Sequence, residues 1–233
     1  MAKRPTSLEK ILNRLEKLYG SQSPVGPTDA YEMVLYRNAG YPQSDERCTK
    51  GFEALKKAIG LRPDEILEVP HKRLAEVMRA GGMIPEMRAS RLKEIAQIVN
   101  REFGGDLQTL MKRPVPEIKK ALKKFPTISD AGAEKILLFT STAEVTALPS
   151  NCIHVPLRLG YGVERKNWAA SYREAQEAVR SELPEEGDAY RRAYLLLKRH
   201  GEELCKSSRP RCEQCPVSEE CLFYQKLRGG KRE

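Results

Sequence analysis

The stretch that most constrains this fold is residues 200–221, which read HGEELCKSSRPRCEQCPVSEEC. Four cysteines lie within 17 residues, with the spacing Cys205-x6-Cys212-x2-Cys215-x5-Cys221. Four thiolates in one short loop can bind either a tetrahedral zinc ion or a [4Fe-4S] cluster. The other two cysteines, Cys48 and Cys152, stand alone. The pattern therefore indicates metal binding in a reducing compartment rather than a disulfide framework.

Outward from this loop, apolar residues recur at helical spacing along almost the whole chain. Near the N-terminus, Leu8, Ile11, Leu12 and Leu15 follow a Thr6-x-x-Glu9 capping box, which predicts an amphipathic helix. No segment alternates as a half-buried strand would, so we expect an all-α fold of roughly ten helices. The other predicted helical segments are 31–38, 45–58, 64–67, 71–80, 90–103, 107–111, 116–125, 136–139, 168–183 and 189–200. Since the N-terminal helix has no neighbour of its own, we expect it to pack beside the C-terminal helices and the cysteine loop, giving two lobes.

Charge and hydropathy narrow the range of partners. The chain of 233 residues has 41 Lys and Arg against 32 Asp and Glu, a formal charge of +9. A basic protein of this kind can bind a nucleic acid, either DNA or RNA, through its positive surface. Alternatively, the positive charges are only solvated. The longest apolar run, Ile136–Phe139, is far shorter than the roughly 18 residues of a membrane helix. Residues 1–5 carry charge without an apolar segment behind them, so we expect a cytoplasmic protein with no membrane partner.

Several segments together resemble the endonuclease III family of helix-hairpin-helix DNA glycosylases. They are the cysteine loop, Asp45–Arg47, Arg91–Ile95 followed by Phe103–Asp106, residues 125–138 and Leu157–Gly160. The resemblance implies an all-α, two-lobed fold in which residues 29–144 form a helical domain with the hairpin. Residues 1–28 and 145–233 would then form a lobe holding a [4Fe-4S] cluster on Cys205, Cys212, Cys215 and Cys221. It also implies a monomer that binds double-stranded DNA, damaged or abasic, and that is nucleoid-associated if bacterial or archaeal.

The hairpin departs from the family pattern, Leu-Pro-Gly-Val-Gly. Thr127 and Ser129 replace both glycines, which calls into question the left-handed backbone that glycine allows. The resemblance implies that the backbone at Thr127, Ile128 and Ser129 binds a DNA phosphate. We expect the two hydroxyls to add hydrogen bonds to that phosphate.

The two positions that carry chemistry in the family are also changed. Ala131 stands where bifunctional members have the lysine that forms a Schiff base, and Pro149 stands where they have an aspartate. Neither side chain can act as a nucleophile or exchange a proton. The resemblance thus implies either an atypical monofunctional glycosylase without lysine-dependent AP lyase activity or a noncatalytic lesion-binding protein. Asp130, Lys135 and Asn151 are the neighbours that could substitute; a lone Cys152 or His154 is weaker evidence.

Further DNA contacts are expected from two loops and from the cysteine segment. In the loops at 40–44 and 81–85, Met83 or Ile84 is a candidate wedge, Tyr41 a candidate stacking residue and Gln43 a candidate inserting residue. Each of these side chains is equally consistent with core packing. In the cysteine segment, Lys206, Arg209 and Arg211 are candidate phosphate contacts or solvated charges.

Overall fold

The computed structural model describes residues 6–229, so the charged segment 1–5 and residues 230–233 lie outside it. Within that range the chain forms α-helices and short 3₁₀ turns with no strand, which confirms the all-α prediction. None of the helices in this range is both long and apolar enough to span a membrane. The chain divides into two compact units, Val25–Thr142 and Met1–Pro24 with Ala143–Glu233.

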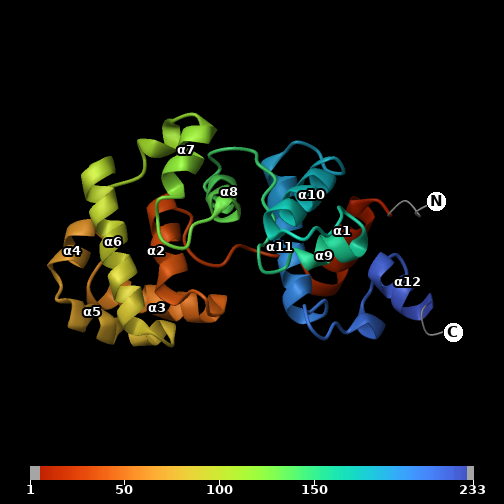
Figure 1. The fold of residues 1–233 in the computed structure, drawn as a ribbon, viewed down its shortest axis with the longest axis horizontal. Coiled ribbons are helices and arrows are strands. Elements are labelled where there is room, and N and C mark those ends of the chain that lie inside the picture. Colours follow the sequence, from red (N-terminus) through yellow and green to blue (C-terminus); the bar gives the residue numbers. More distant parts are fainter. Residues whose placement is uncertain (1–5, 230–233) are drawn as a thin grey trace. The chain divides into compact units, whose positions relative to one another are not determined.

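The unit formed by residues 25–142 is built around α2 (Ala30–Gly40), which packs against α3, α6 and α8 (Figure 1). Nine of its 11 residues are buried, because this helix is covered on nearly every side. The other helices of this unit are α3 (Asp45–Ala58), α4 (Pro63–Glu68), α5 (His71–Met78), α6 (Pro85–Phe103), α7 (Val115–Leu122) and α8 (Asp130–Phe139).

The second unit brings the two ends of the chain together. It contains α1 (Leu8–Tyr19), α9 (His154–Leu159), α10 (Trp168–Arg180), α11 (Gly187–Glu203) and α12 (Leu222–Gly229). Helix α1 lies against α11, as expected, and buries the apolar stripe Leu8, Ile11, Leu12 and Leu15 (Figure 1).

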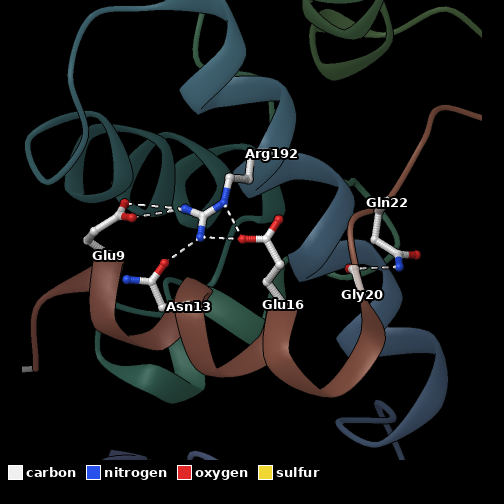
Figure 2. A network of polar contacts seen from close by, with 6 residues as sticks. All are labelled: Glu9, Asn13, Glu16, Gly20, Gln22 and Arg192. Carbon is white, nitrogen blue, oxygen red and sulfur yellow. Dashed lines mark hydrogen bonds and ion pairs between the residues drawn. The ribbon is translucent and has the colours of Figure 1, made fainter.

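A polar network fixes the position of α1 on α11. Figure 2 shows the guanidinium of Arg192 reaching three side chains one or two turns apart on α1. The guanidinium donates to Glu9 (3.1 Å), Asn13 (2.6 Å) and Glu16 (2.8 Å). The same figure shows Gln22 bonded back to the carbonyl of Gly20 just after α1. Arg192 thus fixes how α1 is aligned along α11.

The helix predictions were wrong at four places. The Thr6-x-x-Glu9 capping box does not form: α1 begins at Leu8, and the Leu8 amide donates to Glu182 at 3.3 Å instead. Residues 107–111 were expected to be helical, but only the 3₁₀ turn Leu110–Lys112 forms. Helices α9 and α12 were not anticipated; in α9, Pro156 stands within the six residues and argues against a helix.

Candidate nucleic-acid interface and cysteine site

The four clustered cysteines line one hollow of about 350 Å³ at the surface of the unit formed by the chain ends. The loop from the end of α11 to the start of α12 supplies all four thiols, and the 3₁₀ turn Cys212–Gln214 bends it back on itself. The same hollow is lined by Arg158, His200, Phe223 and Tyr224. The sequence prediction that these cysteines converge is therefore met by the geometry.

Four thiols that line one hollow are a donor set that either a tetrahedral zinc ion or a [4Fe-4S] cluster can use. In residues 6–229 no three Cys, His, Asp or Glu side chains gather tightly enough to hold a single metal ion as they stand. The chemistry of the four thiols fits both groups, so the choice between zinc and the cluster stays a prediction from the resemblance.

Neutral and cationic donors surround the thiols. Arg158 Nη1 lies 3.6 Å from the sulfur of Cys205, and the guanidinium also donates to the carbonyls of Lys206 (2.8 Å) and Ser207 (2.6 Å). His200 Nε2 lies 3.6 Å from the sulfur of Cys215. Arg158 therefore holds the backbone of the cysteine loop as well as one of its thiols.

His200 is held in one orientation by Tyr19 of α1. The Tyr19 hydroxyl lies 3.1 Å from His200 Nδ1. Burial lowers the pKa of His200 to about 4 and raises the pKa of Tyr19 to about 12. The ring is therefore neutral at pH 7, with one nitrogen facing Tyr19 and the other facing Cys215. Burial also raises the pKa of Cys215 to about 11, so a metal bound there would displace its proton.

The hairpin before α8 keeps one left-handed residue although it lacks glycine. Thr127 has φ +64°, the region that ordinarily favours glycine. Its hydroxyl donates to Asn38 Oδ1 at 3.2 Å, and the Asn38 amide donates to the Pro126 carbonyl at 3.0 Å. Asn38 is fully buried in α2. In this structure the Thr127 hydroxyl is therefore bonded to Asn38, and its contact with a DNA phosphate stays a prediction.

Ser129 differs from Thr127 in its backbone. It is the exposed N-cap of α8 with φ −92° and ψ −177°, and its side chain does not cap the helix. Ile128, between the two, is buried. The first residue of α8, Asp130, has an exposed carboxylate that pairs with Lys123 at 2.8 Å. A phosphate at this helix N-terminus would meet that carboxylate, which opposes the attraction of the helix dipole.

Ala131 and Pro149, at the family's two catalytic positions, are both buried. Of the proposed substitutes, Asp130 and Asn151 are exposed and Lys135 is half-buried on α8. Cys152 and His154 are engaged elsewhere: the Cys152 thiol lies 3.7 Å from the carbonyl of Lys198, and His154 Nε2 donates to the carbonyl of Cys205 at 2.7 Å.

The two candidate DNA-reading loops lie together. Met83 and Ile84 are 70% and 54% exposed, which is unusual for large apolar side chains. Tyr41 is half-buried, with the guanidinium of Arg37 4.0 Å above its ring. One face of Tyr41 is thus already covered by a cation. Gln43 lies beside the second loop, where a Cβ placed on Gly82 would be 3.4 Å from its Cγ.

The three cations of the cysteine segment, Lys206, Arg209 and Arg211, are all exposed. Arg158 holds the carbonyls of Lys206 and Ser207, and the Arg211 amide donates to the carbonyl of Leu204 at 2.8 Å. Sequence reasoning missed Asn38, Arg88 and Arg158 as organising residues. For Asn38 the available signal was a polar residue on the apolar face of the predicted helix 31–38, which marks a buried hydrogen-bonding role. Arg88 gave no such signal, because it precedes the predicted helix 90–103.

Comparisons with known proteins agree with this architecture. The chain matches no protein-family model. It is 25% identical over 206 residues to endonuclease III of Thermotoga maritima, covering 88% of each chain. It is 24% identical over 163 residues to a thymine/uracil-DNA glycosylase of Methanothermobacter thermautotrophicus, covering 70% of this chain and 68% of the relative.

Solved structures show the same fold. A non-covalent endonuclease III–DNA complex superposes with a TM-score of 0.74 at 16% identity, covering 95% of this chain and 97% of the other. A thermostable thymine-DNA glycosylase superposes with a TM-score of 0.70 at 19% identity, covering 94% and 96%. The chain is thus similar in sequence to endonuclease III and to DNA glycosylases over most of its length, and it has the fold of endonuclease III.

Proposed function

We propose that the protein recognises damaged duplex DNA and hydrolyses the bond between the damaged base and its sugar, without lysine-dependent strand cleavage. The observation that carries the proposal is the exposed Met83–Ile84 tip beside Gln43, on a chain that is endonuclease III-like over nearly its full length. Enzymes that act on a base must extrude it, and an apolar wedge stabilises the opened stack.

The absence of lysine chemistry follows from Ala131. A Schiff base needs an amine to attack the sugar carbon, and a buried methyl group has no lone pair. Hydrolysis needs only a water molecule, whose oxygen bonds to the sugar carbon while the base leaves with a proton. Among the neighbouring substitutes Asp130, Lys135 and Asn151, Asp130 carries an exposed carboxylate that can accept the proton of such a water.

The cysteine hollow would hold a [4Fe-4S] cluster on Cys205, Cys212, Cys215 and Cys221. When bound, the cluster supplies a cross-link between four points of the loop and no step of base hydrolysis. Arg158 and His200 then stabilise the thiolates by hydrogen bonding, and the fixed loop presents Lys206, Arg209 and Arg211 to DNA phosphates.

A panel of duplexes with oxidised, deaminated or alkylated bases tests the proposal. Base removal is expected to make one of these strands cleavable by alkali, whereas borohydride should trap no covalent complex. The Met83→Ala variant should lose base removal, while Leu18→Ala, which removes a 51% exposed side chain from α1, should not. A borohydride-trapped complex in the wild-type protein would contradict the role assigned to Ala131.

A second function, noncatalytic binding of lesions, is favoured by the burial of both Ala131 and Pro149. In that case no duplex of the panel becomes alkali-labile. The protein would still bind an abasic-site duplex more tightly than intact duplex at matched salt.

A further inference from the structure

A single buried arginine joins the two candidate DNA-reading loops. Arg88 lies in the first turns of α6 and is 2% exposed. Its Nη1 donates to the carbonyls of Gly82 (3.0 Å) and Met83, and its Nη2 donates to the carbonyl of Gly40 at 3.2 Å. Gly40 ends α2 and opens one loop, and Gly82 and Met83 belong to the other, so one guanidinium joins carbonyls that are 42 and 43 positions apart in the sequence.

The elements that lead into the two loops are closely packed. A Cβ added to Gly81 would lie 1.9 Å from the carbonyl oxygen of Ala39 in α2, and one added to Gly51 in α3 would lie 2.4 Å from the same oxygen. This packing holds the bases of the loops together, whereas the contacts of Arg88 reach the Gly82–Met83 segment beyond them.

Packing alone does not account for an arginine here. The acceptors of Arg88 are neutral carbonyls, and its Nε has no hydrogen-bond partner. Burying a cation without a carboxylate costs more than burying a methionine or leucine of similar length. What the guanidinium adds is a planar fork of donors that can reach both loops at once.

The tip of the second loop is also in a strained conformation that Arg88 supports. Ile84 has φ +61° and ψ +54°, a left-handed geometry that is costly for a β-branched residue. The side chain of Arg88 binds the carbonyl of Met83, and its amide donates to the carbonyl of Ile84 at 3.4 Å. The exposed Met83–Ile84 tip is thus anchored on both peptide units by the same residue.

We propose that Arg88 is a positioning residue that locks the 40–44 and 81–85 loops into one rigid reader, so that Gln43 and the Met83–Ile84 tip meet a duplex at a fixed spacing. The proposal rests on the DNA-binding function proposed above. Its consequence is that Arg88 governs discrimination between distorted and intact DNA rather than overall affinity, because the overall attraction comes from exposed cations.

Helix α6 offers a matched control. Lys93 is also a cation that binds carbonyls, those of Ile66 (3.2 Å) and Leu67 (2.9 Å), but it touches neither loop. The variants are therefore Arg88→Met and Lys93→Met, with Arg88→Lys as a milder change that keeps the charge and loses the fork.

The first measurement is amide hydrogen exchange of the free protein. In Arg88→Met, peptides covering 40–44 and 81–85 should lose protection together, while Lys93→Met leaves both unchanged. The second is binding to a duplex with a tetrahydrofuran abasic analogue and to the same duplex intact. The Kd for the intact duplex divided by the Kd for the abasic duplex should fall about tenfold in Arg88→Met. This is the scale expected when buried carbonyls lose a charged donor.

Several results would overturn the proposal. Exchange that rises in only one loop, or in neither, means that Arg88 does not couple them. Equal weakening of both duplexes means that it acts on general affinity. If Arg88→Met does not fold, Arg88→Lys must show the paired loss of protection. If the wild-type protein fails to discriminate between the duplexes, the DNA-binding function fails, while the exchange result still decides whether the loops are coupled.

Discussion

Replacing Thr127 by glycine and by alanine separates its backbone strain from its hydrogen bond. Thr127 has φ +64° and donates to Asn38. Left-handed geometry costs an L-residue about 1–2 kcal/mol, and a hydrogen bond of this kind contributes about 1 kcal/mol. Thr127→Ala keeps the strain and loses the bond, so it should lower the free energy of unfolding by about 1 kcal/mol.

Thr127→Gly also loses the bond but relieves the strain, at the cost of about 0.5–1 kcal/mol in unfolded-chain entropy. The glycine variant should therefore be more stable than the alanine variant by about 0.5–1 kcal/mol. Lys56 is the control, since it is exposed inside α3, where the backbone is right-handed helical. There the order should reverse, with Lys56→Ala more stable than Lys56→Gly by about 1 kcal/mol.

Urea unfolding followed by far-UV circular dichroism measures all four variants, with an unchanged m-value as the condition for comparing midpoints. If Thr127→Ala proves at least as stable as Thr127→Gly, the left-handed assignment at Thr127 is refuted. If Thr127 and Lys56 respond alike, the backbone at Thr127 is not left-handed.

Other predictions concern the metal, the chain ends and the charges. Cys221→Ser should abolish bound iron, acid-labile sulfide and visible absorbance together, whereas the control Cys48→Ser, whose thiol lies outside the hollow, should retain all three. A wild-type protein that contains zinc and no iron would contradict the [4Fe-4S] cluster. Arg192→Met leaves Glu9, Asn13 and Glu16 without their shared donor, so it should lower the free energy of unfolding, measured in urea, by about 1–3 kcal/mol. The control Arg199→Met breaks only an exposed ion pair with Glu203 and should change this free energy little. Equal effects of the two variants would argue against the docking role of Arg192. Asp130→Asn removes the negative charge at the start of α8 and should raise duplex affinity about two- to fivefold at low salt; unchanged affinity would mean that no phosphate binds there. Substituting Lys206, Arg209 or Arg211 by alanine should each reduce the slope of log K for duplex binding against log salt concentration by about 1. The control Lys17→Ala on α1 should leave that slope unchanged. If none of the three variants changes the slope, these residues are solvated charges.

The local elements of this fold follow from sequence, because an amphipathic helix such as α3 shows its apolar period within 14 residues. The convergence of four thiols could also be predicted, since their spacing alone confines them to one loop. The hairpin could not. The conformation of Thr127 depends on Asn38, 89 positions earlier, and no local pattern relates the two residues.

The same limit applies to Arg88 and Arg158. Each donates to carbonyls, and a carbonyl is common to every residue type, so the sequences of the partner loops carry no complementary signature. Helix α9 escapes prediction for a different reason: Pro156 within its six residues argues against a helix, and tertiary packing rather than intrinsic propensity stabilises it.

The docking of α1 on α11 also orders events during synthesis. All helices of the unit at 25–142 are available once residue 142 has been made, whereas α1 has to wait for Arg192 and the rest of α11. A growing chain emerges N-terminus first, so Leu8, Ile11, Leu12 and Leu15 leave the ribosome long before their partners exist. The first helix translated is thus among the last to be buried, and a nascent or truncated chain that ends before residue 187 exposes this apolar stripe to chaperones and to other chains.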